Sequence, residues 1–215
     1  MAYKELKAFL DTEGVTLVAV SKTKPISSIQ ELYNQGHRVF GENRVQELVE
    51  KYNELAKDIQ WHMIGTLQKN KVKYIAPFVS MIHSVDSLDL AKTVNKYALK
   101  SDRQIDVLLQ VKIAKETSKF GFDWEELRAS IGPLSELQSI RIRGLMGMGT
   151  FTADEQTTRD EFQYLKRCFE EFKNQHSHKN SFDTLSMGMS GDYKLAVEEG
   201  STMVRIGSLL FGGRY

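Results

Sequence analysis

Lys22 stands at the end of a run of residues typical of a buried strand. The run, residues 15–20, is mostly apolar and β-branched, and the polar turn SKTKP (residues 21–25) follows it directly. An amine in such a place is desolvated along its stem and open at its head, so it loses its proton more easily than a lysine in water. The unprotonated amine attacks carbonyl carbons and forms imines. Lys24 is expected on the same strand face, and a lysine that only reaches into solvent is the alternative interpretation.

Two short segments rich in glycine and serine have the composition of anion-binding turns. They are residues 186–192 (SMGMSGD) and residues 205–208 (RIGS). Small residues let backbone N–H groups approach an anion closely, and the hydroxyl groups add further donors. Each segment alone is more often an ordinary turn, so its meaning depends on whether the fold brings the two together.

The elements that must position these residues alternate regularly along the chain. Eight β-rich runs are separated by segments with the helical spacing of apolar residues, such as the stripe within residues 45–55. Ser28 and Asp123 each precede a glutamate by three residues, which predicts a helix start at both places. The expected strands are residues 15–22, 39–43, 60–65, 81–85, 105–113, 140–146, 182–187 and 202–206.

Strand–helix alternation requires a parallel sheet with right-handed crossovers, and eight such units close the sheet into a barrel. We therefore predict an α/β fold, a single-domain (β/α)8 TIM-type barrel over residues 1–215, with an open doubly wound sheet as the alternative. Active sites of such barrels lie at the carboxyl ends of the strands, and phosphate is often held after strands seven and eight. The two anion-type segments follow those strands. Together with Lys22 they predict a receptor for a phosphorylated aldehyde.

Composition narrows the class of protein further. A formal net charge of +1 provides no general attraction for nucleic acid or acidic membranes, and no run approaches the roughly 18 apolar residues of a membrane helix. We expect no nucleic-acid or membrane partner and, without a signal peptide, a cytoplasmic protein. The single cysteine, Cys168, is expected to be buried and unreactive. His62 and His83 lack the acidic or thiol neighbours of a metal site, so we expect core or barrel-mouth histidines and no metal.

Six motifs, in order from about residue 15 to the C-terminus, resemble those of the pyridoxal phosphate homeostasis protein family. They are residues 19–25 (AVSKTKP), 40–43 (FGEN), 61–65 (WHMIG), 143–146 (RGLM), 185–190 (LSMGMS) and 203–207 (MVRIG). The resemblance implies a fold-type III barrel that binds pyridoxal 5′-phosphate (PLP), similar to the N-terminal domain of alanine racemase. It also implies a protein that holds PLP as a lysine aldimine, maintains PLP homeostasis and supplies apo-enzymes, without clear catalytic turnover.

Carried over residue by residue, the resemblance makes Lys22 the Schiff-base lysine, a choice over Lys24 that the pattern alone does not make. Arg205 would face the pyridine nitrogen of the cofactor. A guanidinium in that place keeps the nitrogen unprotonated and makes the ring a weak electron sink. Asn43 would lie near the imine or the ring oxygen, although an asparagine at the end of a strand is often only a turn former.

The same resemblance assigns the phosphate to Ser190, Gly207 and Ser208. Ser208 stands where many relatives carry threonine, an exchange that keeps the hydroxyl group. Two departures from the family pattern are a shorter segment before the first strand and Thr66 in place of a proline. We expect Thr66 to cap the helix that follows it.

A PLP-dependent amino-acid racemase is the main alternative function, because alanine racemase uses the same cofactor in a similar barrel. Racemisation needs proton donors on both faces of the substrate, and a chain that ends at Tyr215 is expected to leave no room for the second, β-rich domain of that enzyme. An imine-forming aldolase is a third candidate, but such enzymes carry their lysine on later strands. We expect a monomer whose partners are PLP and apo PLP-dependent enzymes.

Overall fold

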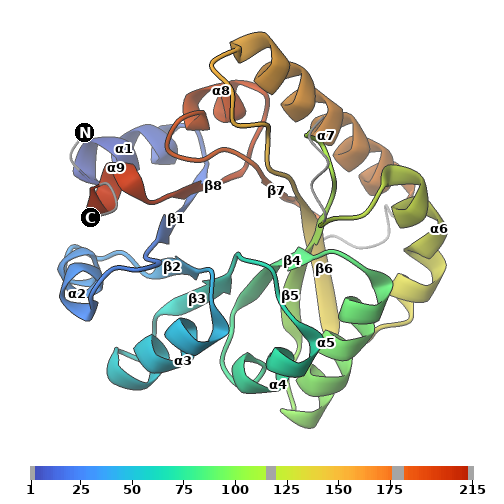
Figure 1. Cartoon of the computed structure of the whole chain (residues 1–215), viewed down its shortest axis with the longest axis horizontal. Coiled ribbons are helices and arrows are strands. Elements are labelled where there is room, and N and C mark those ends of the chain that lie inside the picture. Colours follow the sequence, from blue (N-terminus) through green and yellow to red (C-terminus); the bar gives the residue numbers. More distant parts are fainter. Residues whose placement is uncertain (1–2, 115–119, 176–181, 213–215) are drawn as a thin grey trace.

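Eight parallel strands form a closed barrel in which each strand pairs with its sequence neighbours and β8 pairs with β1 (Figure 1). The computed structural model describes residues 3–114, 120–175 and 182–212. The predicted barrel is confirmed, with several strands shorter at their ends than expected, and the open-sheet alternative is wrong. The strands are β1 (Thr16–Val20), β2 (Val39–Glu42), β3 (Gln60–Met63), β4 (Met81–Val85), β5 (Ile105–Gln110), β6 (Ile140–Met146), β7 (Thr184–Ser186) and β8 (Met203–Ile206).

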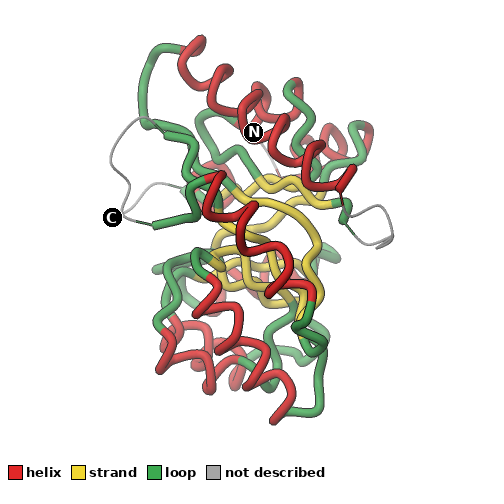
Figure 2. Tube along the Cα trace, turned by 90° about the vertical axis from the view of Figure 1, so that its right-hand side faces the viewer, coloured by secondary structure: helices red, strands yellow, loops and turns green. Residues whose placement is uncertain are grey.

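Helices cover the outside of the barrel, as the side view in Figure 2 shows with helices in red around strands in yellow. None of the helices that the structure describes is long and apolar enough to cross a membrane. The helices are α1 (Tyr3–Thr12), α2 (Ile26–Asn34), α3 (Val45–Glu54), η1 (Lys69–Lys71), α4 (Val72–Ile75), α5 (Leu88–Lys100), α6 (Trp124–Ser135), α7 (Glu155–Gln175), α8 (Tyr193–Glu198) and α9 (Ser208–Phe211).

Alternating side chains of the strands divide the core into two layers. The inner layer fills the barrel and includes Val18 and Leu108, which belong to one cluster of buried apolar residues. The outer layer packs between strands and helices and includes Trp61 and Phe162, both fully buried. Cys168 belongs to this outer layer; it is buried as predicted, and burial raises the pKa of its thiol to about 11. The barrel is therefore a packed core whose polar chemistry has to lie at its ends or in specific buried contacts.

Two of the three predicted helix-start signals are wrong, and the third is right only in position. Helix α2 begins at Ile26, directly after Pro25, so Ser28 lies inside the helix rather than before it. Proline presets the backbone for a helix start and has no N–H group to satisfy there. Asp123 does precede α6, but its carboxylate pairs with Lys112 at 3.1 Å instead of capping the helix. Thr66 caps no helix, because η1 starts at residue 69 after Gln68.

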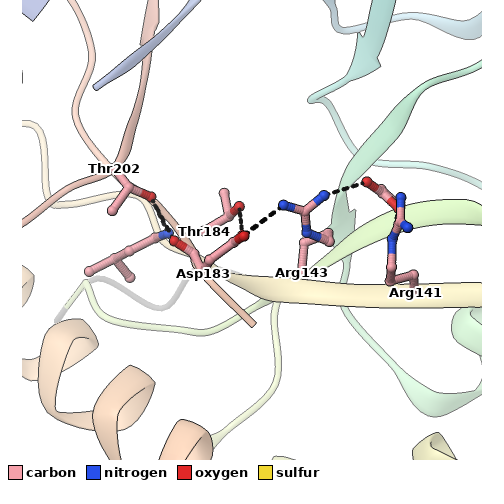
Figure 3. A network of polar contacts seen from close by, with 7 residues as sticks. Arg141, Arg143, Asp183, Thr184 and Thr202 are labelled. Atoms are coloured by element: carbon pink, nitrogen blue, oxygen red, sulfur yellow. Dashed lines mark hydrogen bonds and ion pairs between the residues drawn. The ribbon is translucent and has the colours of Figure 1, made fainter. Parts of the chain in front are cut away.

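Charged residues at the amino ends of β5, β6 and β7 form a continuous network on the barrel rim (Figure 3). Asp106 accepts from Arg141 Nε at 2.6 Å and from Arg143 Nη1 at 2.9 Å. Arg143 Nη2 also donates to both carboxylate oxygens of Asp183, at 2.9 and 2.8 Å. The hydroxyl of Thr202, just before β8, extends the network by donating to the backbone carbonyl of Asp183. These contacts link four neighbouring strands at the end of the barrel opposite to the expected site.

Candidate functional site

A cavity of about 480 Å³ lies at the carboxyl ends of the strands, where the barrel fold predicts a site. Its volume is within the range of small-molecule sites, roughly 300–1,000 Å³. The structure brings all six residues that the sequence predicts for the site to the walls of this one cavity. They are Lys22 after β1, Asn43 after β2, Ser190 after β7, Arg205 on β8, and Gly207 and Ser208 at the start of α9.

The backbone on the N-terminal side of Lys22 is fixed by a buried ion pair behind the barrel wall. Ser21 Oγ donates to Glu42 Oε1 at 2.6 Å, and Lys51 Nζ donates to the same carboxylate oxygen at 2.7 Å and to the Ser21 carbonyl at 2.8 Å. Both charged side chains are nearly inaccessible. Burial raises the pKa of Glu42, and the hydrogen bonds from Lys51 and Ser21 oppose that shift. The other oxygen, Glu42 Oε2, is buried and has no hydrogen-bond partner among the described residues.

The backbone on the C-terminal side of Lys22 is held by the same cluster. Thr23 has a φ of +63°, which is unusual for a β-branched residue and costs of order 1–3 kcal/mol unless its surroundings enforce it. Its N–H donates to Glu47 Oε1 at 2.6 Å, and that oxygen also accepts from Lys51 at 2.6 Å. The cluster therefore fixes the residue before and the residue after Lys22. The sequence shows Glu42 and Lys51 but gives no signal that they meet, because Glu42 ends β2 and Lys51 lies two turns into the helix that follows.

The prediction that Lys24 lies on the same strand face as Lys22 is wrong, because β1 already ends at Val20. Both lysines line the cavity, but Lys24 Nζ donates to the backbone carbonyls of Phe211 and Gly212 at 3.0 and 3.2 Å. These carbonyls lie at the C-terminal end of α9, which favours a cation. Lys24 thus ties the loop after β1 to the helix that follows β8.

The two anion-type segments are joined to each other at the cavity. Gly207 N donates to Ser190 Oγ at 3.3 Å, so the loop after β7 touches the start of α9. A Cβ atom on Gly207 would lie 3.1 Å from the carbonyl oxygen of Val20, which leaves little room for a side chain. Gly188 has a φ of +94°, and a Cβ there would come within 2.5 Å of the Ala196 side chain. Both glycines therefore allow a close approach of backbone that other residues would prevent.

Arg205 lines the cavity with its guanidinium buried among neutral partners. Nη1 donates to the Ser186 carbonyl at 3.0 Å and to Ser186 Oγ at 2.7 Å, and Nη2 donates to the Gly147 carbonyl at 3.0 Å. Within the part of the chain that the structure describes, Arg205 forms no ion pair. Burial lowers the pKa of Arg205 to about 10, an effect that the Asp192 carboxylate opposes, so the group is still a cation at neutral pH.

His62 and His83 are buried and hydrogen-bonded in the barrel interior, as expected of core histidines. His62 Nδ1 lies 3.0 Å from His83 Nε2, and His83 Nδ1 lies 3.3 Å from Ser186 Oγ. Among the described residues, no group of three or more histidine, cysteine, aspartate or glutamate side chains is arranged to hold a metal ion. The sequence missed the link from this pair to Arg205. Two-residue alternation places His62 and His83 on the inner face, but it does not show which residues they meet there.

Comparisons with known proteins agree with the fold over the whole chain. The sequence profile of the alanine racemase N-terminal domain matches residues 2–215. The pyridoxal phosphate homeostasis protein of Aquifex aeolicus is 42% identical over 199 residues, which cover 92% of this chain and 86% of that protein. The protein of the same name from Escherichia coli K12 is 39% identical over 206 residues, 94% of this chain and 87% of that protein.

Solved structures that resemble this chain include one with higher and one with lower sequence identity. PipY of Synechococcus elongatus, solved with PLP bound, has a TM-score of 0.88 and 39% identity, and the match covers 97% of this chain and 99% of PipY. Alanine racemase of Bartonella henselae has a TM-score of 0.70 at 15% identity, a likeness that shows the fold alone.

A closed parallel barrel with a cavity at the carboxyl ends of its strands, matched throughout by that domain profile, defines an alanine racemase-like barrel protein. Within this class, the chain belongs to the pyridoxal phosphate homeostasis protein family. The resemblance inferred from the six sequence motifs is confirmed.

Proposed function

We propose that the chain binds PLP in the cavity at the carboxyl ends of the strands and that Lys22 bonds covalently to it. The observation that carries this proposal is the convergence of an amine, an anion-type loop pair and a buried guanidinium on one cavity. PLP supplies an aldehyde, a phosphate and a pyridine ring, one group for each of these features. The relative PipY has been solved with PLP bound, which supports the same ligand here.

Lys22 is proposed to attack the aldehyde carbon through its unprotonated Nζ. A C=N bond forms, the aldehyde oxygen leaves as water, and the reverse reaction with water or another amine releases the ligand. The ion-paired cluster of Glu42, Lys51 and Glu47 fixes the backbone on both sides of Lys22, which limits where the amine can lie. Asn43, one residue beyond β2, is proposed to donate or accept a hydrogen bond beside the reacting carbon or the ring oxygen.

The phosphate is proposed to lie at the junction of the loop after β7 and the start of α9. Ser190 and Ser208 offer hydroxyl groups, and Gly207 presents backbone without a side chain in the way. Arg205 is proposed to donate to the pyridine nitrogen. Since a guanidinium donates a hydrogen bond but does not give up its proton, the pyridine nitrogen stays unprotonated and the ring a weak electron sink, which suits storage better than carbanion chemistry.

Apolar side chains complete the proposed site by offering walls for the pyridine ring. Ile64, Met148, Phe151 and Met189 line the cavity, and the last three are exposed. Ring burial against such side chains and phosphate contacts in the loops set how long the ligand stays, while the covalent bond remains reversible. We infer a cytoplasmic, monomeric protein that holds a reactive aldehyde, maintains PLP homeostasis and yields PLP to apo-enzymes, without catalytic turnover of its own.

An absorbance titration with PLP tests this proposal. The chain is expected to develop the yellow band of a lysine imine, Lys22→Ala to lose it, and Lys24→Ala to keep it because Lys24 contacts α9 carbonyls instead. A chain that stays colourless, or a Lys24→Ala variant that alone loses the band, would contradict the proposal. Incubation with L-alanine in deuterated water addresses the racemase alternative, which requires uptake of α-deuterium at enzyme-like rates.

A further inference from the structure

A chain of buried hydrogen bonds runs from the candidate site across the barrel interior, through residues to which the proposed function gives no role. Arg205 Nη1 donates to Ser186 Oγ at 2.7 Å, Ser186 Oγ lies 3.3 Å from His83 Nδ1, and His83 Nε2 lies 3.0 Å from His62 Nδ1. The four side chains come from β8, β7, β4 and β3. Their residues are 5%, 0%, 0% and 4% exposed, in that order.

The cation at one end fixes the direction of every hydrogen bond in this chain. Arginine is only a donor, so Ser186 Oγ must accept from it. The described contacts offer the Ser186 hydroxyl proton one acceptor, His83 Nδ1, so His83 carries its own proton on Nε2. His83 Nε2 then donates to His62 Nδ1, which places the His62 proton on Nε2 as well. Only neutral imidazoles fit this pattern, because an imidazolium has no acceptor nitrogen.

The charged groups around the histidines are consistent with neutral rings. Burial lowers the pKa of His62 to about 4, and Asp106 at the amino end of β5 opposes this only in part. Burial also places the pKa of His83 well below its usual range, and both His62 and Arg205 act in the same direction. The positive charge in this part of the barrel therefore stays on Arg205, which faces the cavity.

We propose that His83, supported by His62, is a positioning residue for Arg205: acting through Ser186, it fixes the bonded edge of the guanidinium so that the remaining N–H groups point into the cavity. The inference rests on the proposed function in one respect, namely that Arg205 meets the pyridine nitrogen. It adds that two histidines without contact to the ligand set the strength of that one hydrogen bond. Removing the acceptor at His83 frees the Ser186 hydroxyl to rotate and the guanidinium to turn.

Nitrogen-15 NMR of the protein without ligand tests the hydrogen-bond direction independently of PLP. The expected result is that His62 and His83 are both neutral at neutral pH with their protons on Nε2. A proton on His83 Nδ1, or an imidazolium signal from either residue at neutral pH, would overturn the inference even if PLP binds as proposed.

The affinities of PLP and of an analogue without the pyridine nitrogen, measured on the same protein, test the effect on Arg205. The 1-deaza analogue of PLP has a carbon in place of the pyridine nitrogen, so the unmodified protein should bind it about tenfold more weakly than PLP, as expected for one unpaired buried donor. His83→Phe should shrink this preference to less than about threefold. His83→Asn should restore most of it, because its side-chain oxygen can occupy the place of Nδ1. His37 is a buried histidine that contacts Tyr3 and Val39 and takes no part in these hydrogen bonds, so His37→Asn should leave the preference unchanged.

The outcomes separate the two proposals. If the unmodified protein binds neither ligand, the proposed function fails while the NMR result still decides the hydrogen-bond direction. If PLP binds and the preference survives in a folded His83→Phe variant, the positioning role is wrong. Should His83→Phe not fold, Ser186→Ala removes the same link with a smaller change and must also lower the preference for the inference to stand.

Discussion

At the amino ends of the strands, Arg141 and Arg143 meet Asp106 and Asp183, whereas at the carboxyl ends the partners of Arg205 among the described residues are a hydroxyl group and carbonyl oxygens. The amino-end network is partly exposed and each cation has a carboxylate beside it (Figure 3). The Arg205 guanidinium is buried, and the part of the chain that the structure describes supplies it with no ion-pair partner. One barrel thus neutralises its charges at one end and retains a positive charge at the other.

The difference separates residues that stabilise the barrel from residues that prepare a site. An arginine paired with a carboxylate has little electrostatic attraction left for a ligand, and its contribution is to join neighbouring strands. An arginine solvated by neutral dipoles keeps its charge available to whatever enters the cavity, at a cost in folding free energy. In barrels of this type, the carboxyl ends of the strands are where function is expected and the amino ends are where stability is expected.

The buried cluster of Glu42, Lys51 and Glu47 pairs its charges and also fixes the backbone beside a site residue, Lys22. We expect the largest effect on stability there. Lys51→Met removes the cation from a buried carboxylate, so the free energy of unfolding should fall by about 3–5 kcal/mol, measured by urea denaturation. Lys7→Met is the matched control, because Lys7 pairs with Asp11 on an exposed helix face and should change stability by less than about 0.5 kcal/mol. Equal small losses in both variants would show that the buried pair does not fix the Lys22 segment.

Acid should destabilise the protein through His62 and His83, the two buried histidines that are hydrogen-bonded to each other. The pKa of His62 is about 4 in the folded protein and lies near its usual value of about 6.5 in the unfolded chain. Between these values the unfolded chain binds the proton and the folded protein does not, so stability falls as pH falls. The loss from His62 alone amounts to about 2 kcal/mol by about pH 5, and His83 adds to it. Urea denaturation of His62→Gln over the same range should show a shallower pH slope; an unchanged slope would contradict the assignment.

A substitution at the amino end should affect stability without affecting ligand binding. Arg143→Ala breaks the contacts of a partly exposed arginine with Asp106 and Asp183, so we expect a loss of about 1 kcal/mol in the free energy of unfolding. The affinity for PLP should stay within about twofold, since the site lies at the opposite end of the strands. A large drop in affinity in a folded Arg143→Ala protein would end the separation of roles between the two ends.

The smallest expected effect belongs to a single hydroxyl group of the anion-type loops. Ser190→Ala should weaken PLP binding by about fivefold through the loss of one hydrogen-bonding group, and stability should change by less than about 0.5 kcal/mol. Ser190→Thr keeps the hydroxyl and should retain most of the affinity. Titration of both variants by absorbance distinguishes a contact with the phosphate from a general loosening of the loop, which would weaken both alike.

The sequence predicts the barrel from local patterns, and the family resemblance adds the six residues that the structure places around one cavity. Strand–helix alternation gives the order of all eight strands, and residues at strand ends such as Lys22 and Asn43 must gather at one rim once the barrel closes. Local patterns do not give contacts between side chains from distant segments. Lys51 is three residues after Leu48 on the same helix, but the local pattern does not say what its amine meets, and only the folded chain places it against Glu42.

The same limit applies to the histidine chain and to the helix starts. Alternation assigns His62 and His83 to the barrel interior, but the hydrogen bonds to Ser186 depend on the three-dimensional register of four strands. The signal at Ser28 competes with the one at Pro25, and the proline determines where α2 begins. A capping pattern shows that a residue could cap a helix, whereas the conformation of the preceding loop determines where the helix begins.

The covalent bond at Lys22 is tested most directly by reducing the protein with borohydride after incubation with PLP and mapping the modified peptide by mass spectrometry. The expected result is one pyridoxyl group per chain, located on Lys22, and no label in Lys22→Ala. A label on Lys24, or one spread over surface lysines with Lys22 unmodified, would contradict the central claim that this residue is the reactive amine of the cavity.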